Sequence, residues 1–100
     1  MGSDGTAAAT SAALTSLVTI CNQRGLHARA AARLVKLADQ FDAEITVRKG
    51  DMSASGRSIM GLMMLAAGPG CEVELSASGP DCVAALAAVV DLISRRFDED

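Results

Sequence analysis

The feature that most constrains the fold is a regular switch between two kinds of apolar spacing along residues 16–97. Four short segments have the composition and alternation of strands that bury one face. Three longer segments repeat apolar residues every three or four positions, as an amphipathic helix does. The order of these segments, β-α-β-β-α-β-α, predicts a single α+β domain.

The predicted strands cover residues 16–21, 44–48, 52–55 and 72–77. A Lys-Gly-Asp turn at residues 49–51 predicts a hairpin between the second and third strands. Each strand has one apolar and one polar face. The simplest packing is an open-faced sandwich, in which three helices cover one face of a four-stranded antiparallel sheet.

The three predicted helices differ in how they begin and in what they expose. The first spans residues 28–41, and its polar face carries a basic ridge of Arg29, Arg33 and Lys36. Ser58 is the predicted N-cap of the second, which ends before residues 68–70 and contributes Met64 and Leu65 to the core. The third helix begins at residues 79–81, and its predicted core-facing side chains are Val83, Leu86, Ala87, Val90 and Ile93.

The composition bounds the kind of chemistry that the chain can perform. With 100 residues, half of them apolar but only two aromatic, the core is aliphatic and leaves little room for a cofactor cleft. We therefore expect surface chemistry and no cofactor. Cys21, Cys71 and Cys82 show no CxxC spacing, so we expect small buried side chains in a reducing cytoplasm, with neither a zinc site nor disulfides.

Charge is distributed unevenly along the sequence. Residues 24–57 hold seven basic and four acidic side chains, and residues 58–100 hold two and seven, so the basic half should meet an acidic protein. A nucleic acid is not the expected partner, because the chain as a whole has a net negative charge and almost lacks aromatic side chains.

Residues 1–15 lack a basic signal-peptide start and predict a flexible tail. Residues 98–100 predict an acidic tail, and no apolar run is long enough for a membrane span.

His27 is the only histidine and stands immediately before the first predicted helix. A helix N-terminus presents unpaired N–H groups and a partial positive charge, which together bind anions. Arg29 adds a guanidinium able to hold phosphate oxygens. This placement predicts that His27 and Arg29 could carry a phosphoryl group.

Two motifs resemble those of the HPr family of phosphocarriers. Gly25-Leu26-His27-Ala28-Arg29 resembles the family's phosphorylation site, and Arg57-Ser58-Ile59-Met60-Gly61-Leu62-Met63 resembles its regulatory-serine segment. The resemblance covers about residues 17–97. Residues 41–44 and 97–100 are more similar to the nitrogen-related NPr branch than to the sugar-transport branch.

The resemblance implies a monomeric carrier that is not itself an enzyme. Enzyme I, charged from phosphoenolpyruvate, would phosphorylate Nδ1 of His27, and the group would pass to a histidine of a IIA-type protein. Ser58 would be the phosphosite of an HPr kinase/phosphorylase, set inside the docking surface. The expected partner surface combines charge and apolar side chains: Arg24, Arg33, Lys36, Ile59, Met60 and Met63.

Two residues depart from the family pattern. Ala30 stands where the family usually has proline, and Arg57 stands where a lysine is expected.

Three other functions stay open. One alternative is a regulatory binding module whose phosphorylation state selects its protein targets, and another is the carrier of a sugar-transport system. A third is a small-ligand domain in which His27 is incidental.

Overall fold

Four strands and three helices follow one another in the order that the apolar spacing predicts. The computed structural model describes residues 13–99. Its elements are β2 (Leu14–Thr19), α2 (Ala28–Ala38), β3 (Glu44–Lys49), β4 (Met52–Ser55), α3 (Ile59–Met64), β5 (Glu72–Ser78), α4 (Cys82–Ser94) and a final 3-10 turn, η1 (Arg96–Asp98).

The strands form one antiparallel sheet in the order β2-β5-β3-β4. β2 lies at residues 14–19 instead of the predicted 16–21, because its ladder with β5 already starts at the pair Leu14 and Ala77. Two residues of the predicted tail, Leu14 and Thr15, are therefore part of the sheet. Residues 1–12 of that tail lie outside the described residues.

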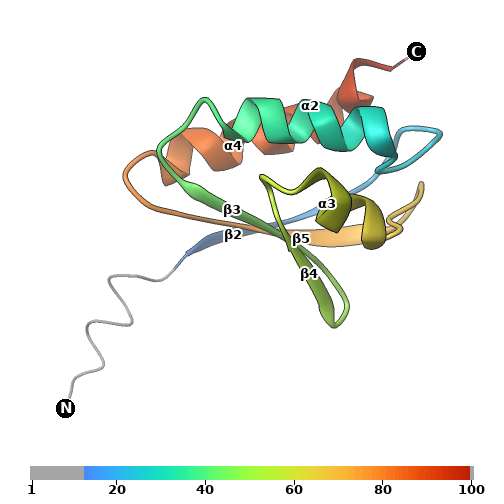
Figure 1. Ribbon diagram of the computed structural model, residues 1–100, viewed down its shortest axis with the longest axis horizontal. Helices are drawn as coiled ribbons and strands as arrows, with labels where there is room; N and C mark the ends of the chain where they lie inside the picture. The colour runs from blue at the N-terminus through green and yellow to red at the C-terminus, as the bar shows by residue number, and fades with distance from the viewer. Residues whose placement is uncertain (1–12, 100) are drawn as a thin grey trace.

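All three helices lie on the same side of the sheet (Figure 1). α4 packs on β2, β3 and β5, α3 packs on β4, and α2 contacts both other helices. The predicted open-faced sandwich is confirmed, and the core between the layers is aliphatic except for Phe97 and the partly buried Phe41. The largest fully buried side chains include Leu34 from α2, Leu62 from α3, Leu75 from β5, Ile93 from α4 and Phe97 from η1.

The predicted rotation of α4 about its axis is wrong. Val83 is 70% exposed and Ala87 is also exposed, whereas Ala85, Val89 and Leu92 are buried. Leu86 and Val90 are partly buried, and only Ile93 lies in the core as predicted. Because α4 is apolar on nearly every side, its spacing could not show which stripe faces the sheet.

Several smaller expectations about burial are also wrong. Met64, the last residue of α3, is exposed, while Leu65 is buried as predicted. The Lys49 ammonium donates to the carbonyls of Leu65 and Ala66 at 3.0 and 3.2 Å, which satisfies carbonyls after the helix end. The cysteines, predicted to be buried, lie near element ends: Cys21 is exposed, and Cys71 and Cys82 are partly exposed.

Ser58 caps α3 as predicted, since its Oγ accepts a hydrogen bond of 3.0 Å from the Gly61 N–H. Ser58→Ala should lower the free energy of unfolding by about 1 kcal/mol, because one N-terminal N–H loses its acceptor. Urea unfolding of the variant measures this loss. Ser94→Ala, at the exposed end of α4, is the matched control and should change stability by less than about 0.5 kcal/mol. Equal effects of the two changes would contradict the capping role.

Candidate functional site

The loop before α2 fixes the position of His27. Gly25 has φ +66°, and a Cβ there would lie 2.4 Å from the Ala67 carbonyl oxygen, so only glycine fits. The next residue, Leu26, donates its N–H to that same oxygen at 2.9 Å. His27 is then the N-cap of α2, and its Nδ1 accepts from the Arg29 N–H at 3.3 Å. The predicted place of His27 at a helix N-terminus is therefore confirmed.

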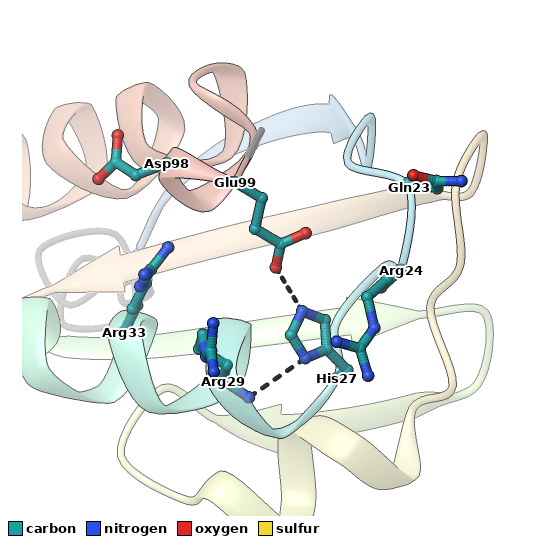
Figure 2. A pocket seen from close by; sticks show the side chains of 7 residues that line it. All are labelled: Gln23, Arg24, His27, Arg29, Arg33, Asp98 and Glu99. Carbon is teal, nitrogen blue, oxygen red and sulfur yellow. Dashed lines mark hydrogen bonds and ion pairs between the residues drawn. The ribbon is translucent and has the colours of Figure 1, made fainter.

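The other ring nitrogen of His27 meets a residue that the sequence analysis did not select. Its Nε2 contacts Oε2 of Glu99, and the two side chains are only 18% and 16% exposed. The second carboxylate oxygen of Glu99 accepts from Nδ2 of Asn22 at 3.0 Å. Asn22 is buried and also donates to the Gly25 carbonyl at 2.8 Å. Figure 2 shows the contact between Glu99 and the His27 ring, and through Asn22 the carboxylate of Glu99 is also linked to the loop that positions the ring.

A pocket of about 340 Å³ surrounds this contact. Three arginines line it together with polar and acidic side chains. The full lining is Gln23, Arg24, His27, Arg29, Arg33, Asp98 and Glu99. The Arg33 guanidinium donates to the Phe97 carbonyl, and Figure 2 shows Arg24 on the other side of His27. The cations make the pocket suitable for an anion.

The predicted basic ridge is divided between two pockets. Arg29 and Arg33 reach the His27 pocket, whereas Lys36 lines a separate one with Arg33 and Arg95. Arg24, predicted only as a partner contact, lines the His27 pocket as well. The ridge therefore begins beside the candidate nucleophile and continues along α2.

The apolar side chains predicted for docking are exposed on α3. Ile59, Met60 and Met63 are 38%, 69% and 39% exposed. Met63 lines a shallow pocket of about 280 Å³ together with Arg24 and His27, so one of the three exposed apolar side chains lies beside the histidine. Exposed apolar clusters next to charged side chains are typical of protein contact surfaces.

The environment of Glu99 makes a prediction about pH. The hydrogen bond from Asn22, with smaller contributions from His27 and Arg24, holds the pKa of the Glu99 carboxyl below its ordinary value of 4.5, although burial opposes this. A carboxyl whose pKa is lower in the folded chain than in the unfolded chain stabilises the fold at pH values above its unfolded-state pKa. This stabilisation is lost as pH falls through the folded-state pKa. The stability difference between wild type and Glu99→Gln should therefore be largest above pH about 4.5 and shrink on acidification.

Urea unfolding at a series of pH values measures that difference. Glu72→Gln is the matched control, because Glu72 is exposed on β5 and lies outside the pocket. Its difference from wild type should change less with pH. A Glu99→Gln difference that grows on acidification would contradict the account.

The structure corrects the prediction that residues 98–100 form an acidic tail. Asp98 belongs to η1, and Glu99 lies against His27. Asp100 lies outside the described residues. Within residues 13–99, no cluster of three or more His, Cys, Asp or Glu side chains could hold a metal ion, and no helix is long and apolar enough to cross a membrane.

Comparisons with known proteins agree with this architecture. The family model for the PTS HPr component phosphorylation site matches residues 14–95. The phosphocarrier protein NPr of Shewanella violacea is 51% identical over 82% of this chain and 90% of its own length. The phosphocarrier protein HPr of Treponema pallidum is 43% identical over 83% of this chain and 94% of its own.

A solved structure shares the fold over most of the chain. HPr-C-His from Thermoanaerobacter tengcongensis superposes with a TM-score of 0.83 at 41% sequence identity, and the superposition covers 87% of this chain and 98% of that protein's chain. The family match, the relatives and the fold all span the part of the chain that holds His27. This chain therefore belongs to the HPr family, the phosphocarriers of the phosphotransferase system.

Proposed function

We propose that the chain accepts a phosphoryl group from enzyme I on Nδ1 of His27 and passes it to a histidine of a IIA-type protein. The observation that carries this proposal is the position of Nδ1, which faces the N-terminal N–H groups of α2 beside Arg29. Enzyme I would itself be charged from phosphoenolpyruvate, as in the family that this chain belongs to.

The local chemistry suits the transfer of a phosphoryl group. The Nδ1 lone pair attacks phosphorus while the bond between phosphorus and the donor breaks, and the donor keeps that electron pair. Phosphoryl transfer is mainly a matter of positioning and charge stabilisation. The N–H groups of α2 and the Arg29 guanidinium stabilise the phosphoryl oxygens, and the partner supplies the rest of the site.

The same surface would dock both partners in turn. Ile59, Met60 and Met63 provide an adaptable apolar contact, and the cations Arg24, Arg33 and Lys36 attract acidic surfaces. Since one copy of the chain contains all of these side chains, we propose that it acts as a monomer and as a carrier, not as a catalyst.

The proposed steering predicts a salt-dependent effect of Lys36→Glu. Its exposed ammonium lies on the ridge without touching His27, so reversing its charge should slow phosphorylation by enzyme I several-fold at low salt. The deficit should shrink in high salt, where charges are screened. Stopped-flow or quench kinetics measure the rate. Arg48→Glu, on the open face of the sheet, is the control, and an equal loss there would contradict steering by the ridge.

Ser58 is proposed as a regulatory phosphosite. It is half-buried at the start of α3 and next to Ile59 and Met60. A phosphate there would sit at the positive end of the helix but bring a double negative charge into the apolar contact. Phosphorylation by an HPr kinase/phosphorylase should therefore weaken docking of enzyme I. Titration of unmodified and Ser58-phosphorylated chain with enzyme I tests this, and equal affinities would contradict it.

The similarity to NPr supports a nitrogen-type pathway. The relative from Shewanella violacea, at 51% identity, bears that name. Phosphorylation should be faster with the nitrogen-type enzyme I and acceptor than with the sugar-type pair, measured with purified proteins and phosphoenolpyruvate. A clear preference for the sugar-type pair would overturn the pathway assignment while leaving the carrier role in place.

A further inference from the structure

The segment after α4 turns back toward His27 through an unusual backbone. Three consecutive residues, Arg96, Phe97 and Asp98, have φ values of 60°, 55° and 60°. This left-handed conformation is disfavoured for residues with a Cβ, and none of the three is glycine. Such a turn persists only where surrounding contacts hold it, and it is typical of functional sites.

Contacts on both sides hold this turn in place. Phe97 is fully buried in the core, and the Arg33 guanidinium donates to its carbonyl. The N–H of Asp98 bonds to the Arg95 carbonyl and that of Glu99 to the Arg96 carbonyl, each at 3.0 Å. The result is that the Glu99 side chain points at the imidazole from above α2 (Figure 2).

The two neighbours of the imidazole select the same proton arrangement. An ionised carboxylate can only accept, so the contact of Glu99 with Nε2 requires a proton on Nε2. A backbone N–H can only donate, so the bond from Arg29 requires a lone pair on Nδ1. The buried amide of Asn22 fixes the second carboxylate oxygen at 3.0 Å and so orients the acceptor.

We infer that Glu99 is a positioning residue for phosphoryl transfer, which holds His27 in the tautomer whose Nδ1 is unprotonated. The Nδ1 lone pair attacks phosphorus once it leaves the hydrogen bond from the Arg29 N–H. This inference rests on the proposed function. When the bond between Nδ1 and phosphorus forms, the ring becomes positively charged and the proton stays on Nε2. The adjacent carboxylate balances that charge, as a carboxylate does for histidine in a catalytic triad.

The geometry favours this role over one in which Glu99 blocks the site. Its carboxylate lies against Nε2, while the nitrogen that faces the anion-binding helix end is Nδ1. Glu99 and the phosphoryl group would therefore occupy different sides of the ring. A blocking role makes the opposite kinetic prediction, since loss of Glu99 would then speed phosphorylation.

Nitrogen-15 NMR of the imidazole tests the tautomer directly. Because His27 is the only histidine, both imidazole nitrogen signals belong to it, and their couplings to the ring protons distinguish Nδ1 from Nε2. In wild type at mildly alkaline pH, Nε2 should show the shift of a protonated nitrogen and Nδ1 that of an unprotonated one. In Glu99→Gln the two shifts should approach each other, because an amide can either donate or accept. Glu72→Gln should retain the wild-type shifts.

The rate of phosphorylation by enzyme I is the second readout. Glu99→Gln should slow it by about tenfold, less than the loss of a triad carboxylate because His27 attacks directly and accepts no proton. Unchanged shifts, or a rate equal to or faster than wild type, would overturn the inference. If no enzyme I phosphorylates wild type, the proposed function fails, and the shifts still decide whether Glu99 sets the tautomer.

Discussion

A His27→Asn variant is expected to accept no phosphoryl group from enzyme I and to remain folded. The chain has no other histidine, so no second imidazole can replace the lost nucleophile. Asparagine is a good N-cap and keeps an acceptor at the start of α2, which separates loss of chemistry from loss of the cap. Intact mass spectrometry after incubation with enzyme I, phosphoenolpyruvate and Mg²⁺ measures the result.

The outcome of that experiment distinguishes two sites. A phosphoryl group on a histidine is lost in acid, whereas one on Ser58 would be retained. An acid-stable mass gain in His27→Asn would place the modification on a hydroxyl, and an acid-labile gain would contradict the assignment of His27. Urea unfolding of the variant confirms that an absent gain does not reflect an unfolded chain.

Phe97→Ala should have the largest effect on stability. Phe97 is fully buried although it lies in a left-handed turn beyond the last long helix. Removing a buried phenyl ring costs about 3–5 kcal/mol, from lost burial and from the cavity left behind. The turn would also lose its anchor, so Glu99 should leave His27. Urea unfolding measures the stability, and the nitrogen-15 shifts of His27 report the local change.

A control for this prediction is available on the neighbouring helix. Val83 is 70% exposed, so Val83→Ala should change the free energy of unfolding by less than about 0.5 kcal/mol. A loss below about 1 kcal/mol in Phe97→Ala would mean that the segment from Arg96 onward is not anchored as described. The position of Glu99 would then lack its structural support.

The order of elements and their layering could be predicted because local sequence spacing determines them. The alternation in β5 and the amphipathic spacing of α2 each identify one buried face. The rotation of α4 could not be predicted in this way, since valine and alanine occur all around that helix. Its buried stripe is set by contact with the sheet, which no local pattern records.

The candidate site was predictable only where it is local. The position of His27 before a helix, with Arg29 two residues later, follows from neighbouring residues alone. The contact with Glu99 joins positions 72 residues apart and depends on a left-handed turn made without glycine. Phe97 gave the one available signal, because an aromatic residue in an otherwise acidic segment indicates that the segment packs on the core.

The most direct test of the account is the intact mass of the wild-type chain after incubation with enzyme I, phosphoenolpyruvate and Mg²⁺. The chain should gain one phosphoryl group that acid removes and that an acceptor IIA-type protein takes away. No gain with either the nitrogen-type or the sugar-type enzyme I would contradict the proposal that His27 carries a phosphoryl group.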